Sequence, residues 1–233
     1  KDIADGHAAT PERVDIPRVA LDCSISRHRQ SITPSEQGDV TYLNRSWLFR
    51  TTSVASARRG IILHALFQQL IWLDDPDSTL DDEKLSSIIR RVAPQAKDAE
   101  CMEFIAEFRK ALNREDIVRL LTRAKHGKEP CEVRTELRFT SIVDNQLVSG
   151  VLDRIVFYPS AASPERIDII DYKTDEIKSE SDRKEHEKRY QGQLDLYRRA
   201  LSASYGLGEN KITTRLVFLD CKCGSGAEQH GTH

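Results

Sequence analysis

The chain has 233 residues and a formal net charge of −2, with 39% hydrophobic and 31% charged residues. This length and composition fit a soluble globular protein made of one large domain or of a domain with an insertion. They argue against a membrane protein, because no apolar run reaches spanning length and no signal peptide is visible. Since the first residue is Lys1 rather than Met, we expect a fragment of a longer protein.

The cysteines and the charge pattern indicate the environment and the partners. There are five cysteines, an odd number without secretory context, so we expect reduced thiols in a cytoplasmic protein. The net charge does not by itself indicate a polyanion partner. Several basic clusters, each usually a solvated face, could together form a stripe for a phosphate backbone. These clusters are Arg45/Arg50/Arg58/Arg59, Arg114 to Lys128, Arg183 to Arg189 and Arg198/Arg199.

The first half of the chain predicts an arm followed by helices. Residues 1–40 mix charge and proline and are interpreted as an N-terminal arm or linker, which leads into a domain over 41–222. From Arg58 to Leu73 apolar residues recur at helical spacing and predict a buried helix that carries His64. A lone histidine there is more often a satisfied core residue than a ligand. An all-helical insertion is predicted at about 75–127, with helices over about 81–94, 98–112 and 113–124.

The second half of the chain changes to strand patterns. Two alternating runs joined by Asp144-Asn145 predict a hairpin, with Glu136 on the first strand and Asp153 on the second. Alternation places Asp153 on one face with Val151, Ile155 and Phe157, where a carboxylate needs a partner or a cation. A charged helix over 180–205, a last strand over 212–219 and a disordered tail over 223–233 complete the prediction.

A short apolar run, Ile167 to Thr174, ends in the sequence Asp171-Tyr172-Lys173. If the run is a strand, Asp171 and Lys173 emerge side by side on the face of Ile167 and Ile169. Such a pair can hold a divalent cation and steer a water. The alternative is a surface ion pair at a strand end.

Four motifs in this order are similar to those of the RecB-like nuclease domain of the PD-(D/E)xK superfamily. This domain is found at the C-terminus of AddA and other UvrD-type helicase-nucleases. The residues that resemble the GxxxH, GxxDR, DYKT and YxxQxxxY signatures are Gly60 to His64, Gly150 to Arg154, Asp171 to Thr174 and Tyr190 to Tyr197. The resemblance covers about residues 58–220. It implies an α/β (α+β) restriction-endonuclease-like core, a mixed β-sheet flanked by helices.

The resemblance implies metal-dependent hydrolysis of DNA phosphodiesters and a role for each motif residue. His64, Asp153, Asp171 and the Tyr172 carbonyl would bind the cation, Lys173 would orient or help deprotonate the attacking water, and Glu136 would support the site. DNA contacts are implied for Gln193, Tyr197, Tyr190, Arg154 and Thr174, with Gln193 and Tyr197 alternatively bracing the metal ligands.

The residue types fit this chemistry independently of the family. Carboxylate oxygens suit Mg²⁺ or Mn²⁺, and a histidine tilts the preference slightly toward Mn²⁺. Lysine is a compact cation that can stabilise charge on a phosphate. No Gly-x-x-x-x-Gly-Lys-[Ser/Thr] loop is present, so we expect no ATP hydrolysis. The family resemblance itself bears on the cysteines, because similar nuclease domains that hold an iron–sulfur cluster place one cysteine before the histidine helix and three after the glutamine–tyrosine helix. This chain has Cys23 before it but only Cys221 and Cys223 after it, so we expect no iron–sulfur cluster.

The leading hypothesis is therefore an exonuclease domain from a helicase-nuclease that acts in double-strand break repair. Its expected partners are single-stranded DNA ends, the helicase domains of the same longer chain and a second nuclease subunit. One alternative is a catalytically inactive nuclease-like module that guides DNA or docks a helicase. Another is that the singled-out groups are purely structural, with Asp153 paired to Arg154 or Lys173.

Overall fold

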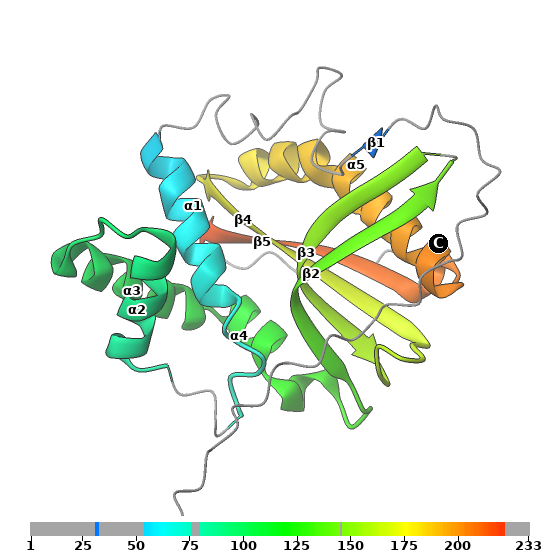
Figure 1. Ribbon diagram of the computed structural model, residues 1–233, viewed down its shortest axis with the longest axis horizontal. Coiled ribbons are helices and arrows are strands. Elements are labelled where there is room, and N and C mark those ends of the chain that lie inside the picture. The colour runs from blue at the N-terminus through cyan, green and yellow to red at the C-terminus, as the bar shows by residue number, and fades with distance from the viewer. Residues whose placement is uncertain (1–30, 33–53, 76–79, 145, 222–233) are drawn as a thin grey trace, which may run out of the picture.

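A computed structural model describes residues 31–32, 54–75, 80–144 and 146–221 (Figure 1). Its helices are α1 (Val54–Phe67), α2 (Asp82–Val92), α3 (Asp98–Leu112), α4 (Glu115–Leu121) and α5 (Glu180–Tyr205), with the 3₁₀ turns η4 (Arg123–His126) and η5 (Glu209–Lys211). Its strands are β1 (Ser31–Ile32), β2 (Glu132–Val143), β3 (Gln146–Tyr158), β4 (Arg166–Ile177) and β5 (Ile212–Cys221). The predicted α/β class and mixed sheet are confirmed.

The described strands form one mixed sheet around β3. Strand β3 pairs antiparallel with β2 along nearly its whole length, parallel with the short β1 at Leu147 and Val148, and antiparallel with β4 from Arg154 to Tyr158. Strand β4 then pairs in parallel with β5. The parallel pair is joined by the long helix α5, the crossover connection that parallel strands require. The pairing between β3 and β4 covers only the last residues of β3 and the first residues of β4, and it stops within both strands at Arg154 and Ile170.

Two apolar clusters cover the two faces of the sheet. The first cluster contains buried residues of the four helices α1, α2, α3 and α4 together with Val156, Ile170, Tyr172 and Val217 of the sheet. The second contains buried residues of α5 together with Phe157 and other strand residues. In Figure 1 the helices α1–α4 lie to the left of the sheet and α5 runs along its upper side. On β4, Ile167 and Ile169 belong to the second cluster, whereas Ile170 and Tyr172 belong to the first. This confirms the predicted alternation of β4.

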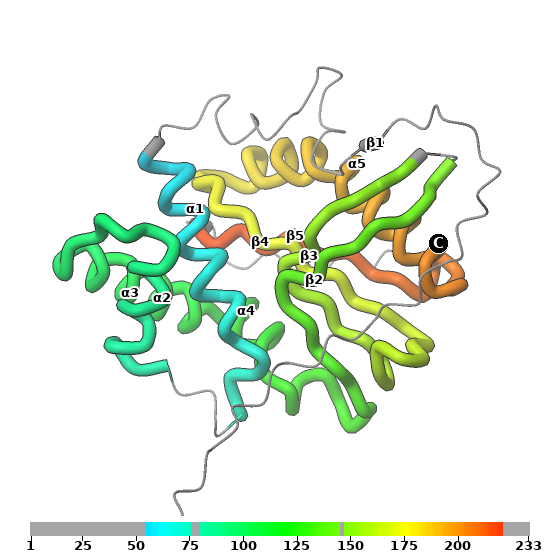
Figure 2. Tube along the Cα trace, viewed as in Figure 1, coloured from blue at the N-terminus to red at the C-terminus, as the bar shows by residue number. Residues whose placement is uncertain are grey.

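The alternation of the β2–β3 hairpin reverses in its middle, which the sequence pattern did not predict. On β2, Val133 packs against the first cluster, but Leu137 and Phe139 pack against the second, although all three have the same parity. Glu136 lies between them with a φ of +51°. Strand β3 switches in step, because Leu152 and Ile155 both join the second cluster. The tube in Figure 2 shows both strands bending near this point.

The helix α1 begins four residues before the predicted Arg58 and ends at Phe67, six residues before Leu73. Its last turn tightens, since the N–H groups of Gln69 and Leu70 donate to carbonyls three residues back. Leu70 and Trp72 are buried although they lie beyond the helix end. The apolar pattern therefore indicated buried positions correctly there but not helical structure. A hydrogen bond from the Leu73 N–H to the Leu121 carbonyl holds the following segment on α4.

Helices α2, α3 and α4 lie where an all-helical insertion was predicted. Helix α2 begins after Asp81, whose side chain accepts from the Lys84 N–H at 2.7 Å, as expected for an N-cap. Its buried residues Leu85, Ile88 and Ile89 form one stripe. The third predicted helix, 113–124, is shorter in the structure and passes into the 3₁₀ turn η4.

Most of the predicted arm and the predicted tail, including Cys23 and Cys223, lie outside the described residues. Ser31 and Ile32 are the described part of the arm and form β1. Cys101 and Cys131 are free thiols. Among the described residues, no helix combines the length and apolarity needed to cross a bilayer.

Candidate metal centre and nuclease site

Helix α1 carries His64 close to the sheet because Gly60 permits a close approach to β4. A Cβ atom built on Gly60 would lie 3.1 Å from Oγ1 of Thr174, tighter than most packed Cβ contacts. One turn further along α1, the His64 ring lies 6.4 Å, centroid to centroid, from the Tyr172 ring in an edge-on arrangement. The glycine and the histidine of the first motif therefore belong to one contact between α1 and β4.

His64, Glu136 and Asp153 meet at the bend of the hairpin. One ligand atom from each can be chosen so that all three atoms lie within 4.8 Å of one another. His64 Nδ1 lies 3.3 Å from Oδ1 of Asp153. Glu136 is opposite Asp153 on the neighbouring strand, where its positive φ interrupts the regular side-chain alternation. One imidazole nitrogen and two carboxylates form a donor set that suits Mn²⁺ or Mg²⁺.

Asp153 lies where the pairing between β3 and β4 ends. The last paired residues are Arg154 and Ile170. Immediately beyond them, Oδ2 of Asp153 accepts the backbone N–H of Tyr172 at 2.7 Å. The carboxylate thus replaces a ladder hydrogen bond, and its other oxygen remains directed at His64.

Asp171 and Lys173 form a buried ion pair on the face of β4 opposite to that of Tyr172. Lys173 Nζ lies 2.7 Å from Oδ2 of Asp171, and the two side chains are only 8% and 5% exposed. The alternative of a surface ion pair is therefore wrong. The ammonium also donates to Oε1 of Gln193 at 3.1 Å and lies 4.3 Å from the ring centroid of Tyr190. This environment fixes both charges beside the Asp153 carboxylate.

Helix α5 supplies the groups that brace this pair. Gln193 Nε2 is 3.3 Å from Oδ1 of Asp171 and donates to the Tyr197 hydroxyl at 2.7 Å. The Tyr197 hydroxyl donates in turn to the Val151 carbonyl at 3.2 Å. Because Gln193 and Tyr197 are buried, their contacts support bracing over the alternative of DNA contact. Tyr190 is half-buried, and its hydroxyl donates to Oδ2 of Asp175 at 2.9 Å.

The structure places Arg154 differently from the expected DNA contact. Its side chain is fully buried and donates to the carbonyls of Leu70 and Ile71 at 2.7 and 2.5 Å. Its guanidinium lies 5.0 Å from the Trp72 ring centroid. An arginine enclosed in this way cannot reach a nucleic-acid backbone at the surface, and here it holds the segment after α1 on β3. The suggested pairing of Asp153 with Arg154 is likewise replaced by the contact with His64.

The pKa values of the site groups follow from burial and from mutual charge. Burial raises the pKa of Asp171, the Lys173 ammonium opposes this, and repulsion from Asp153 adds to it. Burial and then Asp153 raise the pKa of Glu136. Burial opposes ionisation of Asp153 and His64, but their mutual attraction outweighs it, so the Asp153 pKa is lowered and the His64 pKa is raised. Burial is thus the main reason that the pKa values of Glu136 and Asp171 are raised, and repulsion from Asp153 adds to it.

The structure groups the predicted ligands differently from the sequence. His64 and Asp153 are brought together as predicted, and Glu136, expected only in support, joins them. Asp171 lies outside that 4.8 Å group and pairs with Lys173, although its charge still acts on Asp153 and His64. Tyr172 meets Asp153 through its N–H, and its ring packs near His64.

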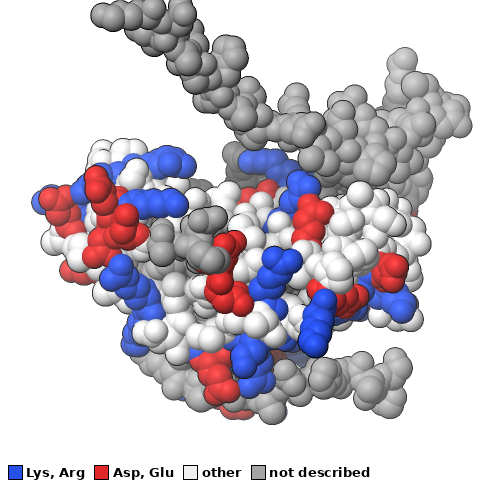
Figure 3. Space-filling view, turned by 90° about the horizontal axis from the view of Figure 1, so that it is seen from below, with Lys and Arg blue, Asp and Glu red and all other residues white. Residues whose placement is uncertain are grey.

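Several arginines of the predicted basic clusters pair with acidic side chains within the described part of the chain. Arg58 pairs with Glu100, Arg114 with Asp116 and Arg198 with Asp195. Arg199 pairs with Asp144. On the face shown in Figure 3, basic and acidic side chains alternate rather than gathering by sign. These arginines are thus offset locally by acidic partners.

Two contributors near the site were missed by sequence reasoning. Arg59, counted only within a basic cluster, donates to the Thr174 carbonyl at 2.9 Å. Asp175, directly after the DYKT motif, accepts from Tyr190 and faces Nδ1 of His186 at 3.3 Å. The available signal in the sequence was that Arg59 directly precedes Gly60 and that Asp175 directly follows Thr174. Their partners could not be predicted in this way, because they lie on other elements of the chain.

Comparison with known proteins agrees with this geometry. A family model described as the PD-(D/E)XK nuclease superfamily matches residues 40–231, and the chain belongs to this superfamily. Members of this class are nucleases that use divalent metal ions. The chain is also similar to an ATP-dependent helicase/nuclease subunit of Streptococcus sanguinis (strain SK36), with 28% identity over 178 residues. The match covers 73% of this chain but only 13% of that relative's length.

Proposed function

We propose that this chain is a divalent-metal-dependent deoxyribonuclease domain with exonuclease activity. The observation that carries the proposal is the convergence of His64, Glu136 and Asp153 beside the buried Asp171–Lys173 pair. The bend of the hairpin, helix α1 and the end of the β3–β4 ladder create this convergence. A purely structural explanation does not account for so many ionisable groups gathered in one place.

His64, Glu136 and Asp153 would hold the metal ion, with Asp171 and the Tyr172 carbonyl as the further ligands that the superfamily motifs imply. A bound Mg²⁺ or Mn²⁺ would polarise the phosphoryl oxygen and lower the pKa of a water. Burial raises the pKa values of Glu136 and Asp171 most, and repulsion from Asp153 adds to both. A cation would favour the ionised form of these carboxylates and relieve that repulsion, which supports the assignment.

Lys173 would act on the attacking water or on the phosphate. Asp171 and Gln193 hold its ammonium at 2.7 and 3.1 Å, so the charge is positioned before substrate arrives. Tyr190 lies against the same ammonium and is half-buried, which supports a role at the edge of the DNA path. Thr174 also lies near this edge, through its contact with Gly60.

The similarity to a helicase/nuclease subunit supports a place in a longer chain with a motor. The substrate would then be a single-stranded DNA end delivered by helicase domains, in double-strand break repair. A second nuclease subunit would be a further partner. The match to only 13% of that relative is consistent with one domain of a larger protein.

The direct test is cleavage of end-labelled single-stranded DNA by the purified chain with Mn²⁺ or Mg²⁺. Asp171→Ala and Lys173→Gln should each lower the rate by at least about 100-fold. Lys173→Gln should still bind Mn²⁺ in calorimetry, because lysine is not a ligand. Equal cleavage by wild type and both variants would overturn the assignment.

The competing function is a nuclease-like module that binds or guides DNA without cutting it. It predicts DNA binding without cleavage and no Mn²⁺ binding that depends on Asp153. A Mn²⁺ titration of wild type and Asp153→Asn distinguishes the two functions, because only the nuclease requires a specific ion at that carboxylate.

A further inference from the structure

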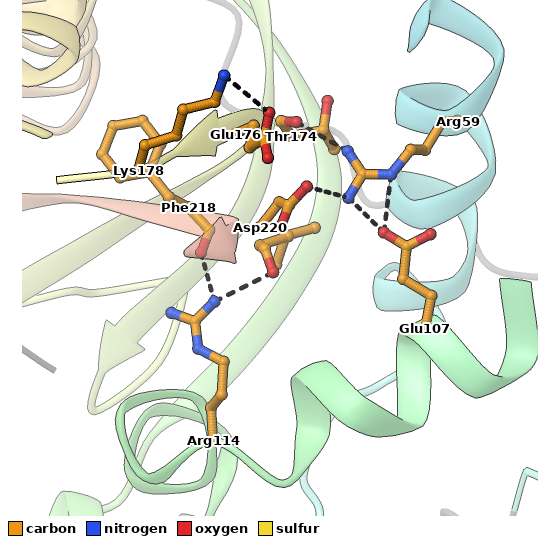
Figure 4. A network of polar contacts seen from close by, with 9 residues as sticks. Arg59, Glu107, Arg114, Thr174, Glu176, Lys178, Phe218 and Asp220 are labelled. Atoms are coloured by element: carbon orange, nitrogen blue, oxygen red, sulfur yellow. Dashed lines mark hydrogen bonds and ion pairs between the residues drawn. The ribbon is translucent and has the colours of Figure 1, made fainter. Parts of the chain in front are cut away.

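Arg59 connects four elements at the N-terminal end of the histidine helix (Figure 4). From α1, its guanidinium donates through Nη1 to the Thr174 carbonyl of β4 at 2.9 Å and through Nε to Glu107 of α3 at 2.7 Å. Its Nη2 lies 3.0 Å from Oδ2 of Asp220 on β5. The Arg59 side chain is 25% exposed. We propose that Arg59 is a positioning residue that fixes α1 on β4 and thereby holds His64 at the metal centre.

The chemistry of this contact requires arginine in particular. Three partners approach from different directions, and the planar guanidinium offers five N–H donors in a fixed fork. A lysine would retain the charge but could not meet the carbonyl and both carboxylates with the same geometry. Two acidic partners face one cation, so loss of Arg59 leaves Glu107 and Asp220 near each other without their shared counterion.

The connection to His64 runs along the helix itself. His64 follows Arg59 by five positions in one continuous helix, a rise of about 7.5 Å, so a shift at one is transmitted to the other. The strand partner is also close to the chemistry, because Thr174 directly follows Lys173. Arg59 therefore ties the helix of one metal ligand to the strand of the catalytic pair, at the point where Gly60 and Thr174 touch.

The contact between Arg59 and Glu107 also connects the helices that follow α1 to the site. Glu107 lies on α3, and its ion pair with Arg59 links that helix to the N-terminal part of α1. The inference rests on the proposed metal function, since it assigns Arg59 a role in placing a ligand for the ion. Ligand positions must be held to within a fraction of an ångström for tight binding, so a small displacement of α1 is sufficient to weaken it.

The test compares Arg59 with Arg114, which offers a matched control in the same network (Figure 4). Arg114 donates to the Phe218 and Leu219 carbonyls of β5 and pairs with Asp116, so it joins α4 to β5 from outside α1. The variants Arg59→Met, Arg59→Lys and Arg114→Met would be prepared in the 233-residue chain. Three quantities would be measured: the Mn²⁺ dissociation constant, the free energy of unfolding in urea and hydrogen exchange of the α1 amides without metal.

We expect Arg59→Met to raise the Mn²⁺ dissociation constant about 10- to 100-fold, Arg59→Lys to give an intermediate value and Arg114→Met to stay within about 2-fold of wild type. Exchange of the α1 amides should accelerate in Arg59→Met and not in Arg114→Met. If Arg59→Met does not fold, Glu107→Gln and Asp220→Asn weaken the same contact from the partner side and should give a smaller loss of affinity.

The inference is overturned if the Arg59 and partner variants bind Mn²⁺ like wild type, or if Arg114→Met loses as much affinity as Arg59→Met. Failure of the proposed function gives a different result, namely no Mn²⁺ binding by wild type. In that event the exchange of the α1 amides still decides whether Arg59 holds the helix.

Discussion

The carboxylate of Asp153 accepts the backbone N–H of Tyr172 at 2.7 Å, immediately beyond the last paired residues of β3 and β4. One oxygen thus completes the sheet while the other lies 3.3 Å from His64. The side chain therefore has a structural role and, under the proposed function, would also bind the metal ion, and the two roles can be separated by substitution.

Asp153→Asn and Asp153→Ala should differ in their free energy of unfolding but should lose Mn²⁺ affinity to a similar extent. Asparagine retains an acceptor for the Tyr172 N–H, whereas alanine leaves that N–H unpaired at a cost of about 1–3 kcal/mol. Both remove the charge, so both should weaken Mn²⁺ binding at least about 10-fold. Urea unfolding and calorimetry check the two quantities. Unchanged Mn²⁺ affinity in Asp153→Asn would contradict the ligand assignment.

Glu136→Gln should stabilise the metal-free protein at pH 7. The pKa of Glu136 is raised in the folded state, by burial and then by Asp153, so its ionised form favours unfolding. This penalty is present at neutral pH and disappears as the pH falls below the ordinary glutamate value, where the carboxyl is neutral in both states. The gain, below about 1 kcal/mol because the group is only half-buried, should therefore shrink toward pH 4.

When Mn²⁺ is present, wild type should be more stable than Glu136→Gln. Binding to the native state stabilises wild type in proportion to its affinity, and Glu136→Gln should gain less. Thermal unfolding with a chelator and with excess Mn²⁺, each at several pH values, measures both effects. A variant that is more stable than wild type under every condition would show that Glu136 contributes nothing to metal binding.

Gly60 and Thr174 should be energetically coupled. Alanine in a helix interior is normally more stable than glycine by about 0.5–1 kcal/mol. At Gly60 the added Cβ would lie 3.1 Å from Oγ1 of Thr174, so the normal gain should be lost in wild type and recovered in a Thr174→Ala background. A double-mutant cycle measures this coupling in urea, and strict additivity of the two substitutions would show that α1 can shift without penalty.

Arg154→Met should reduce the free energy of unfolding by about 1–3 kcal/mol, because the carbonyls of Leu70 and Ile71 lose their donors and the contact with Leu70 is buried. Arg119→Met, at an exposed helical pair with Glu115, is the control and should change stability by only about 0.3–0.5 kcal/mol. Equal effects in urea unfolding would mean that the interior contacts of Arg154 are replaced by water.

The sequence alone predicted most of the helices and strands and the candidate residues of the site. Apolar periodicity predicted the helix of His64, the three helices that follow it and the β2–β3 hairpin, because local spacing decides which face is buried. Alternation in Ile167 to Lys173 also placed Asp171 and Lys173 on one face, which the structure confirms. The motif order was sufficient to predict the superfamily to which the chain belongs.

Only the tertiary structure decided how those residues are grouped. The positive φ of Glu136 reverses the hairpin faces and brings its carboxylate to His64 and Asp153, and strict alternation gives no sign of such a reversal. Burial turned Arg154 from an expected DNA contact into an interior donor. Arg59 meets Glu107 and Asp220 across 48 and 161 residues. Such partners are set by the packing of helices on the sheet, which short-range periodicity does not encode.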